Sequence, residues 1–377
     1  MRFTVSRALD TIEQRLTTDP VLACAVVDLA PVVRHAGLDN GRPANLLRLG
    51  MVIDALARHL SDDSVAVYPV ADRGLLSDLE LTSNEKMVIR RWADDGLAEV
   101  VADTADPADG PSGGGLATER VLEIAALTGL PLVGERDYGP YRERFAGIVG
   151  TSRHLVPMPG VTGGATLAPG GGVTGVAATP AGAHPVLRRL WRCPEPQCAS
   201  FGAPGAQPPP RLGRGQPTCP RHGHQLTDAG AAPEAAPMVV VLAESARHRF
   251  VVRADRPVPV GRNPEEPGVR LGLLLDDETA PLVSRSHLRM ELAAGALTVV
   301  DTSTNGTAVL VRTGPDAPPQ RVELTRGERR ALGEWDTVEL HPGVELASAR
   351  HWRGGTVGAP GMLAEAPTMA FRIPPQS

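Results

Sequence analysis

The sequence predicts a multidomain protein with an α/β domain built on a parallel sheet, a small cysteine-containing module and an all-β sandwich. Its 377 residues exceed the usual size of a single domain. Strand-like and helix-like apolar patterns alternate over residues 1–158, whereas short alternating strands separated by turn residues fill 238–350. Between these regions, three of the four cysteines lie within 193–219. These three observations divide the chain into its parts.

The first part alternates predicted strands and helices in the order that is typical of a parallel sheet covered by helices. The strands are short apolar runs rich in β-branched residues, and the helices carry apolar residues at helical spacing. The predicted strands are 23–28, 65–70, 99–101 and 131–133, and the predicted helices are 42–60, 84–94 with Asn84 as its N-cap, and 117–127.

Segments rich in Gly, Ala and Pro separate the predicted domains. Such segments bury too little apolar surface to become ordered. We therefore expect flexible linkers at 159–185 and 228–237, a cysteine module at 186–227, the sandwich at 238–350 and a disordered tail at 351–377.

Composition and charge exclude some classes of function. The net charge is −5, and residues 1–160 hold 23 acidic and 16 basic residues, so a broad basic surface for nucleic acid is not indicated. The start of the chain is polar and no apolar run approaches the roughly 20 residues that span a bilayer, so we expect a cytoplasmic protein without membrane contact. Lys86 is the only lysine, an arginine bias that fits a GC-rich bacterial genome.

The cysteine module has the spacing of a metal site. Cys193 and Cys198 form a C-x4-C pair, and Cys219 and His222 form a C-x2-H pair. Three thiolates and one imidazole can close a tetrahedral Zn²⁺ site, and about 40 residues without an evident core need such a staple. The pattern resembles a zinc ribbon with a structural role. His224 competes as the fourth ligand, and a disulfide or free thiols are the alternatives to zinc.

Three short motifs in the sandwich place phosphate-binding groups in successive loops. Arg262 can donate charge-assisted hydrogen bonds to a phosphate oxygen, and Ser284 can add a hydroxyl donor. Asn305 can bind a peptide backbone with both halves of its amide. Loops at one end of a sandwich can converge on such a ligand while the sheets hold them in place. The motifs are Gly261-Arg262, Ser284-Arg285-Ser286-His287 and Asp301-Thr302-Ser303-Thr304-Asn305-Gly306-Thr307.

This series resembles the forkhead-associated (FHA) family, which reads phosphothreonine, over roughly 110 residues. The resemblance implies phosphate or peptide contacts for Arg262, Ser284, Arg285, Thr304 and Asn305. It implies loop support for Gly261, His287 and Gly306. The alternative is that the polar side chains of these motifs only cap loops of a sandwich.

Carboxylates follow the predicted parallel strands of the first domain. Asp28, Asp72, Asp103 and Asp137 come after the four strands in turn, and Glu119 lies in the first turn of a helix. Ligands of open parallel sheets bind beyond the carboxyl ends of the strands. Acids gathered there can hold Mg²⁺ or Mn²⁺ and activate water against a phosphodiester. Scattered, solvated carboxylates are the other interpretation.

Residues 1–158 also resemble the PIN-like, NYN-type ribonucleases. The closest stretches are Val26-Val27-Asp28, residues 69–73, 119–126 and 132–145. The resemblance implies that Asp28, Asp72, Glu119 and Asp137 are metal-binding catalytic residues. The chain departs from the family where Asp28 is followed by Leu-Ala-Pro, and where Arg136 stands on the family's last aspartate.

Two functions follow as hypotheses. The first is a phosphothreonine-dependent adaptor in bacterial Ser/Thr kinase signalling, which docks threonine-phosphorylated proteins and uses the first domain as effector or scaffold. The alternative is a metal-dependent ribonuclease regulated by phosphopeptide binding, for which the acidic balance does not favour RNA as a partner. Thr368, in the tail, could occupy the chain's own sandwich when phosphorylated.

Overall fold

The computed structural model forms two compact units. It describes residues 2–60, 62–101, 115–161, 163–170, 184–202, 207–213, 215–265, 267–314 and 316–350. The first unit contains the described residues of Met1–His59 and Val65–Gly230, and the second those of Leu60–Ser64 and Ala231–Gly355. No helix in the described part of the chain is both long and apolar enough to cross a membrane.

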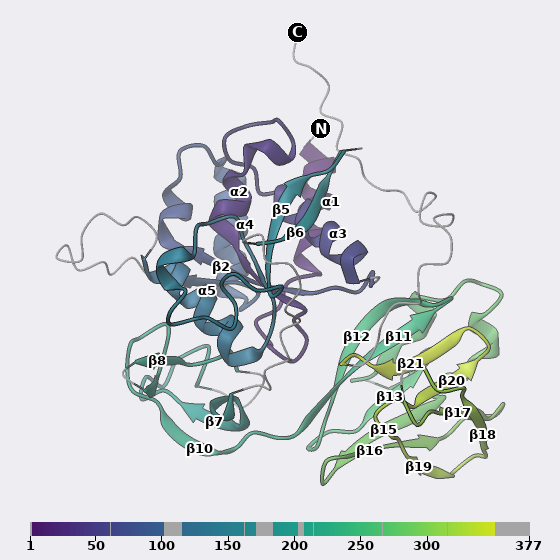
Figure 1. Cartoon of the computed structure of the whole chain (residues 1–377). Helices are drawn as coiled ribbons and strands as arrows, with labels where there is room; N and C mark the ends of the chain where they lie inside the picture. The colour runs from purple at the N-terminus through teal and green to yellow at the C-terminus, as the bar shows by residue number, and fades with distance from the viewer. Residues whose placement is uncertain are drawn as a thin grey trace. The chain divides into compact units, whose positions relative to one another are not determined.

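The first unit is built on a six-stranded sheet in the order β3-β2-β1-β4-β5-β6, flanked by helices (Figure 1). The five strands from β3 to β5 are parallel, and β6 runs antiparallel to β5. The predicted α/β architecture with a parallel sheet is therefore confirmed. The strands are β1 (Ala25–Asp28), β2 (Val67–Asp72), β3 (Glu99–Val101), β4 (Leu132–Val133), β5 (His154–Pro159) and β6 (Ala165–Pro169). The helices are α1 (Arg2–Glu13), α2 (Leu29–Arg34), α3 (Arg48–Leu60), α4 (Ser83–Asp94) and α5 (Gly115–Thr128), with short 3-10 turns η1 (Ala36–Leu38), η2 (Arg73–Ser77) and η4 (Gly139–Tyr141).

The core of this unit explains why the strands read as continuous apolar runs. All four residues of β1 are buried, as expected for a central parallel strand covered on both faces. Val121 and Leu122 of α5 belong to the same buried cluster as Val26 of β1 and Val70 of β2. Burial of this cluster stabilises the sheet and fixes the direction in which its carboxyl edge points.

Two segments predicted as linkers form strands instead. Ala165–Pro169 pairs with β5 as an edge strand, where prolines are tolerated because the outward N–H groups need no partner. The second predicted linker contains β10 (Thr227–Ala231) and the start of β11 (Ala235–Leu242), so the prediction of a linker at 228–237 is wrong. The rest of the first linker, 171–183, and the tail lie outside the described residues.

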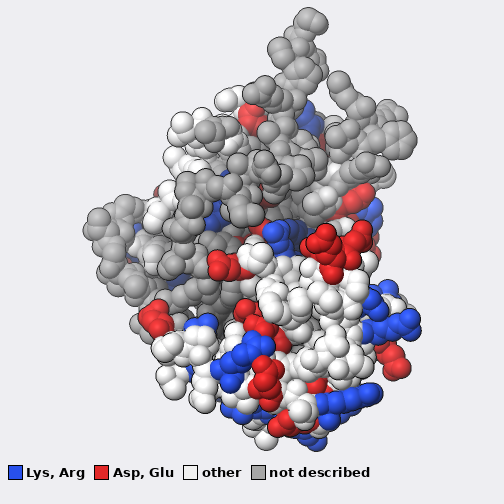
Figure 2. All heavy atoms as spheres, turned by 90° about the vertical axis from the view of Figure 1, so that its right-hand side faces the viewer, with Lys and Arg blue, Asp and Glu red and all other residues white. Residues whose placement is uncertain are grey.

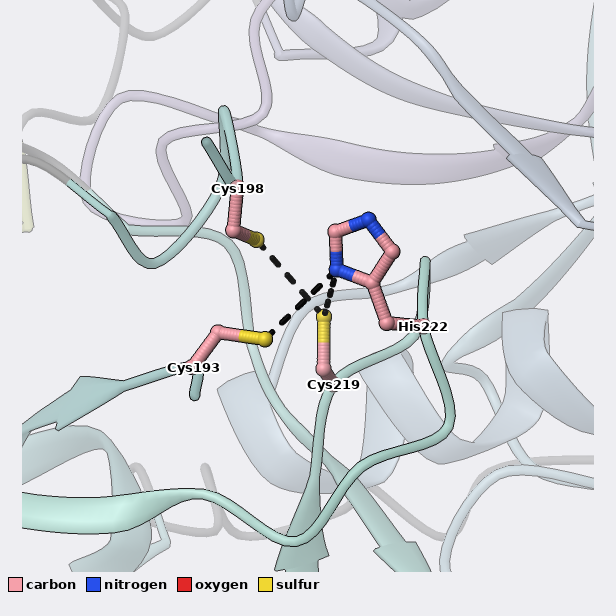
Figure 3. A group of neighbouring side chains, drawn as sticks. All are labelled: Cys193, Cys198, Cys219 and His222. Atoms are coloured by element: carbon pink, nitrogen blue, oxygen red, sulfur yellow. Dashed lines mark hydrogen bonds between the residues drawn. The ribbon is translucent and has the colours of Figure 1, made fainter. Parts of the chain in front are cut away.

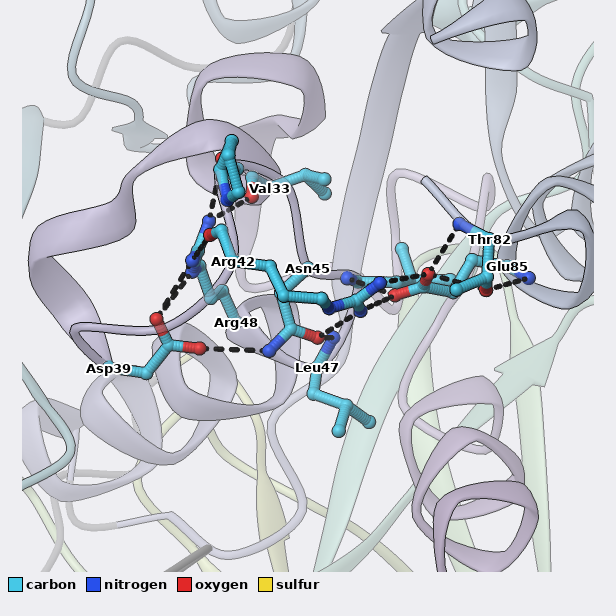
Figure 4. Close-up of polar contacts among 10 residues, drawn as sticks. Val33, Asp39, Arg42, Asn45, Leu47, Arg48, Thr82 and Glu85 are labelled. Atoms are coloured by element: carbon cyan, nitrogen blue, oxygen red, sulfur yellow. Dashed lines mark hydrogen bonds and ion pairs between the residues drawn. The ribbon is translucent and has the colours of Figure 1, made fainter. Parts of the chain in front are cut away.

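Helix α3 begins at Arg48, six residues later than predicted, because a buried polar cluster holds the preceding turn (Figure 4). The Arg48 side chain is fully buried and donates to the carbonyl of Val33 at 2.6 Å and to the Asp39 carboxylate at 3.0 Å. Glu85 accepts from Arg42 at 2.7 Å and from the Leu46 amide at 3.0 Å. These bonds replace the helical bonds that residues 42–47 would otherwise make.

The start of α4 also differs from the prediction. Thr82, not Asn84, is the N-cap, and Thr82 and Glu85 form a capping box. The Thr82 amide donates to the Glu85 carboxylate at 2.9 Å, and the Glu85 amide donates to the Thr82 hydroxyl at 3.3 Å. The Thr-x-x-Glu signature was present in the sequence, two residues upstream of the predicted cap.

The cysteine module packs within the first unit. It consists of η5 (Pro185–Arg188), β7 (Arg189–Arg192), β8 (Arg211–Gly213), β9 (Gln216–Thr218) and β10. Strand β7 pairs with β10, and β8 with β9. Its small core contains the three cysteines with Phe201 and Leu226, and Trp191 packs against it.

A buried arginine of α5 joins this module to the sheet. Arg120 has no exposed surface, and its five N–H donors make five hydrogen bonds. Its acceptors are both carboxylate oxygens of Glu99, one of Glu123, and the carbonyls of Pro209 and Pro210, just before β8. A guanidinium with every donor satisfied is the arrangement in which a buried charge is tolerated.

The second unit is a β-sandwich, as predicted (Figure 1). One sheet has the order β12-β11-β21-β20-β17-β18 and the other β14-β13-β15-β16-β19. One buried cluster, with Val240, Val260, Met290, Val309 and Leu346 among its members, takes residues from both sheets. The strands after β11 are β12 (Ser245–Arg253), β13 (Val258–Gly261), β14 (Val269–Arg270), β15 (Leu288–Ala293), β16 (Ala296–Asp301), β17 (Thr307–Val311), β18 (Gln320–Leu324), β19 (Arg329–Ala331), β20 (Thr337–His341) and β21 (Val344–Ser348), with turns η6 (Leu271–Leu273) and η7 (Ala280–Leu282).

Charges of both signs lie beside one another on the face shown in Figure 2. The ion pairs of the second unit include Arg321 with Glu323 at 2.6 Å. This face therefore carries no broad basic patch, in agreement with the net charge of −5.

Candidate functional site

Three loops of the sandwich are joined by hydrogen bonds at the positions of the predicted phosphopeptide residues. Arg262 directly follows β13, Ser284 follows η7, and Thr304 and Asn305 lie between β16 and β17. The Arg262 amide donates to the carbonyl of Ser284 at 2.9 Å, so the first two loops are fixed to each other through their backbones.

The second and third loops are joined through side chains. The Ser284 hydroxyl accepts from the Thr304 amide at 3.2 Å and lies 3.2 Å from the Thr304 hydroxyl. The Asn305 amide nitrogen donates to the carbonyl of Leu282 at 3.0 Å. Ser284, Thr304 and Asn305 thus form one connected polar surface, and Asn305 keeps its second N–H for a ligand.

His287 supports this arrangement through hydrogen bonds to two of the loops. It is buried, its Nδ1 accepts from the Ser284 amide at 3.2 Å, and its Nε2 lies 3.2 Å from the carbonyl of Gly306. A carbonyl can only accept, so the proton resides on Nε2 and the ring is neutral. Burial lowers the pKa of His287, which keeps this neutral form at physiological pH.

Two glycines are required by the backbone itself. A Cβ on Gly261 would lie 2.3 Å from the carbonyl oxygen of Arg285, so any side chain would separate the first two loops. Gly306 has φ of +83°, in the left-handed region that glycine adopts without strain. Both positions therefore hold the loops in their present contact.

Asp301 is a supporting residue to which the sequence analysis assigned no role. It is fully buried at the end of β16, and its Oδ1 accepts from the Ser303 amide at 2.9 Å and the Thr307 hydroxyl at 2.8 Å. This carboxylate shapes the turn that presents Thr304 and Asn305. The Asp-x-Ser spacing of an Asx turn was the available signal.

The two arginines of the site are free to bind an anion. Within the described residues, no ion pair or side-chain hydrogen bond engages Arg262 or Arg285, and Arg285 is exposed. Their charges lie on loops fixed to Ser284, whose hydroxyl is a neutral donor. Such a set suits a phosphate dianion, which accepts charge-assisted hydrogen bonds on several oxygens.

The four predicted zinc ligands also come together (Figure 3). The Sγ atoms of Cys193, Cys198 and Cys219 and one ring nitrogen of His222 all lie within 4.8 Å of one another, and the cysteines are buried. His222 rather than His224 completes the group; the two rings stack with centroids 6.3 Å apart. Among the residues that the structure describes, this is the single group of three or more potential metal ligands.

The spacing of these atoms fits a tetrahedral zinc ion. Zinc–sulfur bonds of about 2.3 Å and zinc–nitrogen bonds of about 2.05 Å give tetrahedron edges of roughly 3.8 Å between sulfurs and roughly 3.6 Å between sulfur and nitrogen. The observed distances are 3.8 Å between Cys198 and Cys219, and 3.5 and 3.7 Å from His222 Nδ1 to Cys193 and Cys219. All four positions are filled by protein, so the group has the form of a structural site.

Two of the predicted acids meet at the carboxyl edge of the parallel sheet, but an arginine lies between them. Arg136 Nε donates to Asp28 Oδ2 at 2.9 Å, and a terminal nitrogen of Arg136 lies 3.6 Å from Asp72 Oδ2. The Tyr138 hydroxyl also donates to Asp28 Oδ2, at 3.0 Å. Asp28 is 1% exposed and its Oδ1 has no hydrogen-bond partner. Burial raises the pKa of Asp28, although the Arg136 guanidinium acts against this shift.

The other predicted acids lie apart from this pair. Glu119 forms an ion pair with Arg144, and Asp137 accepts from the Gly139 amide at 2.8 Å. Neither joins Asp28 and Asp72 in a group with the spacing of metal ligands within the described residues. Asp103 lies outside the described residues.

Comparison with known proteins gives matches to solved structures alone. No protein-family model matches the chain, and no curated protein does. The matched structures include several FHA domains, which cover about 30% of this chain.

Three of these structures differ in their sequence identity to this chain. The FHA domain of human APLF, in complex with an XRCC1 bisphospho peptide, is 20% identical, with 29% of this chain and 97% of that one covered and a TM-score of 0.23. An FHA domain from Chlamydia trachomatis is 16% identical, with 30% and 98% covered and a TM-score of 0.23. The FhaA FHA domain, complexed with the intracellular domain of Rv3910, is 25% identical, with 29% and 97% covered and a TM-score of 0.18.

Proposed function

We propose that the protein is a phosphothreonine-dependent binding protein whose second unit docks threonine-phosphorylated partners. The observation that carries the proposal is a cluster of three loops joined by hydrogen bonds: the Arg262 amide bonds to the Ser284 carbonyl, the Thr304 amide to the Ser284 hydroxyl, and the Asn305 side chain to the Leu282 carbonyl. The loops are hydrogen-bonded to one another already, so little ordering entropy is lost when a ligand binds.

Each residue would have a distinct task at this site. Arg262 and Ser284 would bind phosphate oxygens, Thr304 and Arg285 would adjoin the phosphate or the peptide, and Asn305 would bind the peptide backbone. Hydrogen bonds to a charged group contribute about 1.5–3 kcal/mol each, so loss of Arg262 should weaken binding by roughly 10- to 150-fold. His287, Gly261 and Gly306 would act through loop geometry.

A phosphopeptide library tests the proposal. Full-length protein is titrated with degenerate peptides centred on phosphothreonine, phosphoserine or unmodified threonine, and affinities are read by fluorescence anisotropy. We expect measurable binding only of the phosphothreonine pool and its loss in Arg262→Ala. Arg256→Ala is the matched control, because this exposed arginine precedes β13 whereas Arg262 follows it. Equal binding of the three pools by the wild type would contradict the proposal.

The cysteine module, in this account, is a zinc ribbon with a structural role. The donor set and the ligand spacing support Zn²⁺ at Cys193, Cys198, Cys219 and His222. When bound, the ion would tie β7 to the turn after β9, in a module whose own apolar core is small. A ribbon held in this way would keep Pro209 and Pro210 against Arg120.

A second candidate function, metal-dependent ribonuclease activity of a PIN-like first unit, is favoured by one observation. Asp28, with an unpaired buried oxygen, and Asp72 both contact Arg136 at the edge of the sheet where ligands of parallel sheets bind. Mg²⁺ or Mn²⁺ held there would supply a metal-activated water. Glu119 and Asp137 would have to move to join it, and Arg136 would have to leave.

A ribonuclease assay decides between the two functions of the first unit. The full-length protein is incubated with single-stranded and structured RNA, with Mn²⁺ or with EDTA, beside Asp28→Asn. We expect no metal-dependent cleavage, because the Arg136 cation contacts both acids and repels a metal ion. Cleavage by the wild type that EDTA and Asp28→Asn abolish would establish the nuclease and assign Arg136 a role in gating it.

The setting proposed for the adaptor is a bacterial Ser/Thr kinase pathway, in which the kinase creates the phosphothreonine. Thr368, the proposed internal ligand, lies outside the described residues. Its test is the affinity of an external phosphopeptide for kinase-treated protein and for Thr368→Ala: an internal ligand lowers the affinity in the first and not in the second.

A further inference from the structure

A pocket of about 500 Å³ lies in the first unit, apart from the sandwich loops and the cysteine cluster. The pocket is open to solvent, and its volume falls within the range of roughly 300–1,000 Å³ found for small-molecule sites. The lining residues are Arg73, Gly74, Leu76, Ser77 and Arg90. Four of them belong to η2, which directly follows β2, and Arg90 comes from α4. The pocket therefore lies beyond the carboxyl end of a parallel strand, where ligands of such sheets bind.

The two arginines of the pocket are unpaired. Arg73 and Arg90 are exposed, and no ion pair or side-chain hydrogen bond engages either one within the part of the chain that the structure describes. Their neighbours differ in this respect: Arg91 is paired with Glu13, and Arg34 with Asp78. Two guanidiniums that share a pocket without counter-charges repel each other, and an anion between them removes that cost.

The carboxylates closest in sequence to the pocket are already occupied. Asp72 accepts from the Leu75 amide at 2.9 Å and faces Arg136. Asp78 accepts from Arg34 at 2.8 Å and from the Glu80 amide at 2.9 Å. Both acids therefore accept hydrogen bonds or ion pairs from other groups, and neither is paired with Arg73 or Arg90.

We propose that this pocket binds the phosphate group of a small phosphate monoester, such as a nucleoside monophosphate. Two guanidiniums can each donate paired N–H bonds to a phosphate dianion. The Ser77 hydroxyl, which now donates to the Gly74 carbonyl at 3.0 Å, is placed to add a neutral hydrogen bond. Leu76 gives the pocket an apolar wall for the rest of the ligand.

Charge favours a small ligand over RNA as the source of the phosphate. Residues 1–160 carry 23 acidic and 16 basic residues, a field that repels an extended polyanion. A single phosphate held between two arginines senses mainly the local charge, because more distant exposed charges are screened over about 10 Å. The proposal does not depend on the phosphopeptide site, from which the test must distinguish it.

Isothermal titration of the full-length protein with AMP, inorganic phosphate, adenosine and a short single-stranded RNA tests the proposal. Arg73→Gln and Arg90→Gln remove one charge each from the pocket. Arg91→Gln is the matched control, since it removes the same charge from the next residue of α4, outside the pocket. Arg262→Ala reports phosphate bound by the sandwich instead. All four side chains are at least partly exposed, so the folded state should survive, and thermal melts verify this.

We expect AMP and phosphate to bind and adenosine not to bind. Arg73→Gln and Arg90→Gln should each weaken AMP by about 10-fold or more, and Arg91→Gln and Arg262→Ala by less than about 2-fold. Absence of binding at millimolar AMP, or an equal loss in Arg91→Gln, would overturn the proposal. A loss of AMP binding confined to Arg262→Ala would also overturn it, because the phosphate would then bind in the sandwich. Tighter binding of RNA than of AMP through Arg73 and Arg90 would overturn it as well.

Discussion

Replacing Arg120 with methionine should destabilise the first unit strongly. Methionine keeps most of the apolar stem and the volume of the side chain but removes all five donors. Glu99 then loses its counter-charge while its side chain is only 12% exposed, and Glu123, 10% exposed, keeps the weaker pair with Arg211 at 3.8 Å. The carbonyls of Pro209 and Pro210 lose their donor as well, so the contact of the cysteine module with α5 is weakened.

The size of the effect follows from the burial of the pair. Removing one partner of a buried ion pair costs about 3–5 kcal/mol, because the remaining charge stays buried without compensation. For a unit of this size, each kcal/mol lowers the melting temperature by about 2–4 °C. We therefore expect Arg120→Met to melt roughly 6–20 °C below the wild type.

Urea denaturation followed by circular dichroism, with zinc present throughout, measures this loss. Arg144→Met is the matched control, since Arg144 pairs with Glu119 at the surface with its side chain 59% exposed and should contribute about 0–1 kcal/mol. A triple variant, Arg120→Met with Glu99→Gln and Glu123→Gln, removes the stranded charges and should recover part of the stability. A loss below about 1 kcal/mol in the single variant would refute the reasoning, as would a triple variant no more stable than the single one.

Three further predictions concern the metal, the sheet edge and the sandwich. Elemental mass spectrometry should find about one zinc ion per chain in the wild-type protein. Cys219→Ser should lose the ion and unfold at a lower urea concentration. Full zinc retention in that variant would exclude Cys219 as a ligand. Arg136→Asn should create Mn²⁺ binding at Asp28 and Asp72 that titration calorimetry detects and the wild type lacks; Mn²⁺ binding of equal strength in both proteins would contradict the role of Arg136 as the internal cation. Burial lowers the pKa of His287 in the folded state, so the unfolded chain binds a proton more readily than the folded one. The stability that neutral His287 supplies is therefore present above a pH of about 6.5, the pKa of histidine in the unfolded chain, and is lost as the pH falls below it. When the urea unfolding midpoint is plotted against pH, His287→Gln should show a smaller fall below pH of about 6.5 than the wild type. Parallel plots for the two proteins would show that His287 does not cause the fall.

Local sequence signals predicted the parts of the structure that local chemistry determines. The Cys-x4-Cys and Cys-x2-His spacings were enough to select the four atoms that converge, because knuckles of this length bring their two ligands together without help from the rest of the chain. The sandwich motifs likewise fall in loops that the strands bring into contact. Strands β1 to β4 of the first unit were predicted from their apolar runs, which in β1 are buried throughout.

What depends on distant partners was not predicted. Composition marked Ala165–Pro169 as linker, yet it has an open edge of β5 to pair with. Arg120 reads as an ordinary helix residue, and its acceptors Pro209 and Pro210 lie about 90 residues away in sequence. The position of Arg136 between Asp28 and Asp72 could not be predicted without the folded sheet. The sequence had shown only that an arginine stands where the ribonuclease family has an acid.

Binding of a phosphothreonine peptide pool by wild-type protein and by Arg262→Ala tests the central claim most directly. We expect the wild type to bind the phosphothreonine pool and not its phosphoserine or unmodified counterparts. Arg262→Ala should weaken this binding by about 10-fold or more, and Arg256→Ala should keep it. Binding that ignores the phosphate, or that survives intact in Arg262→Ala, would contradict the claim.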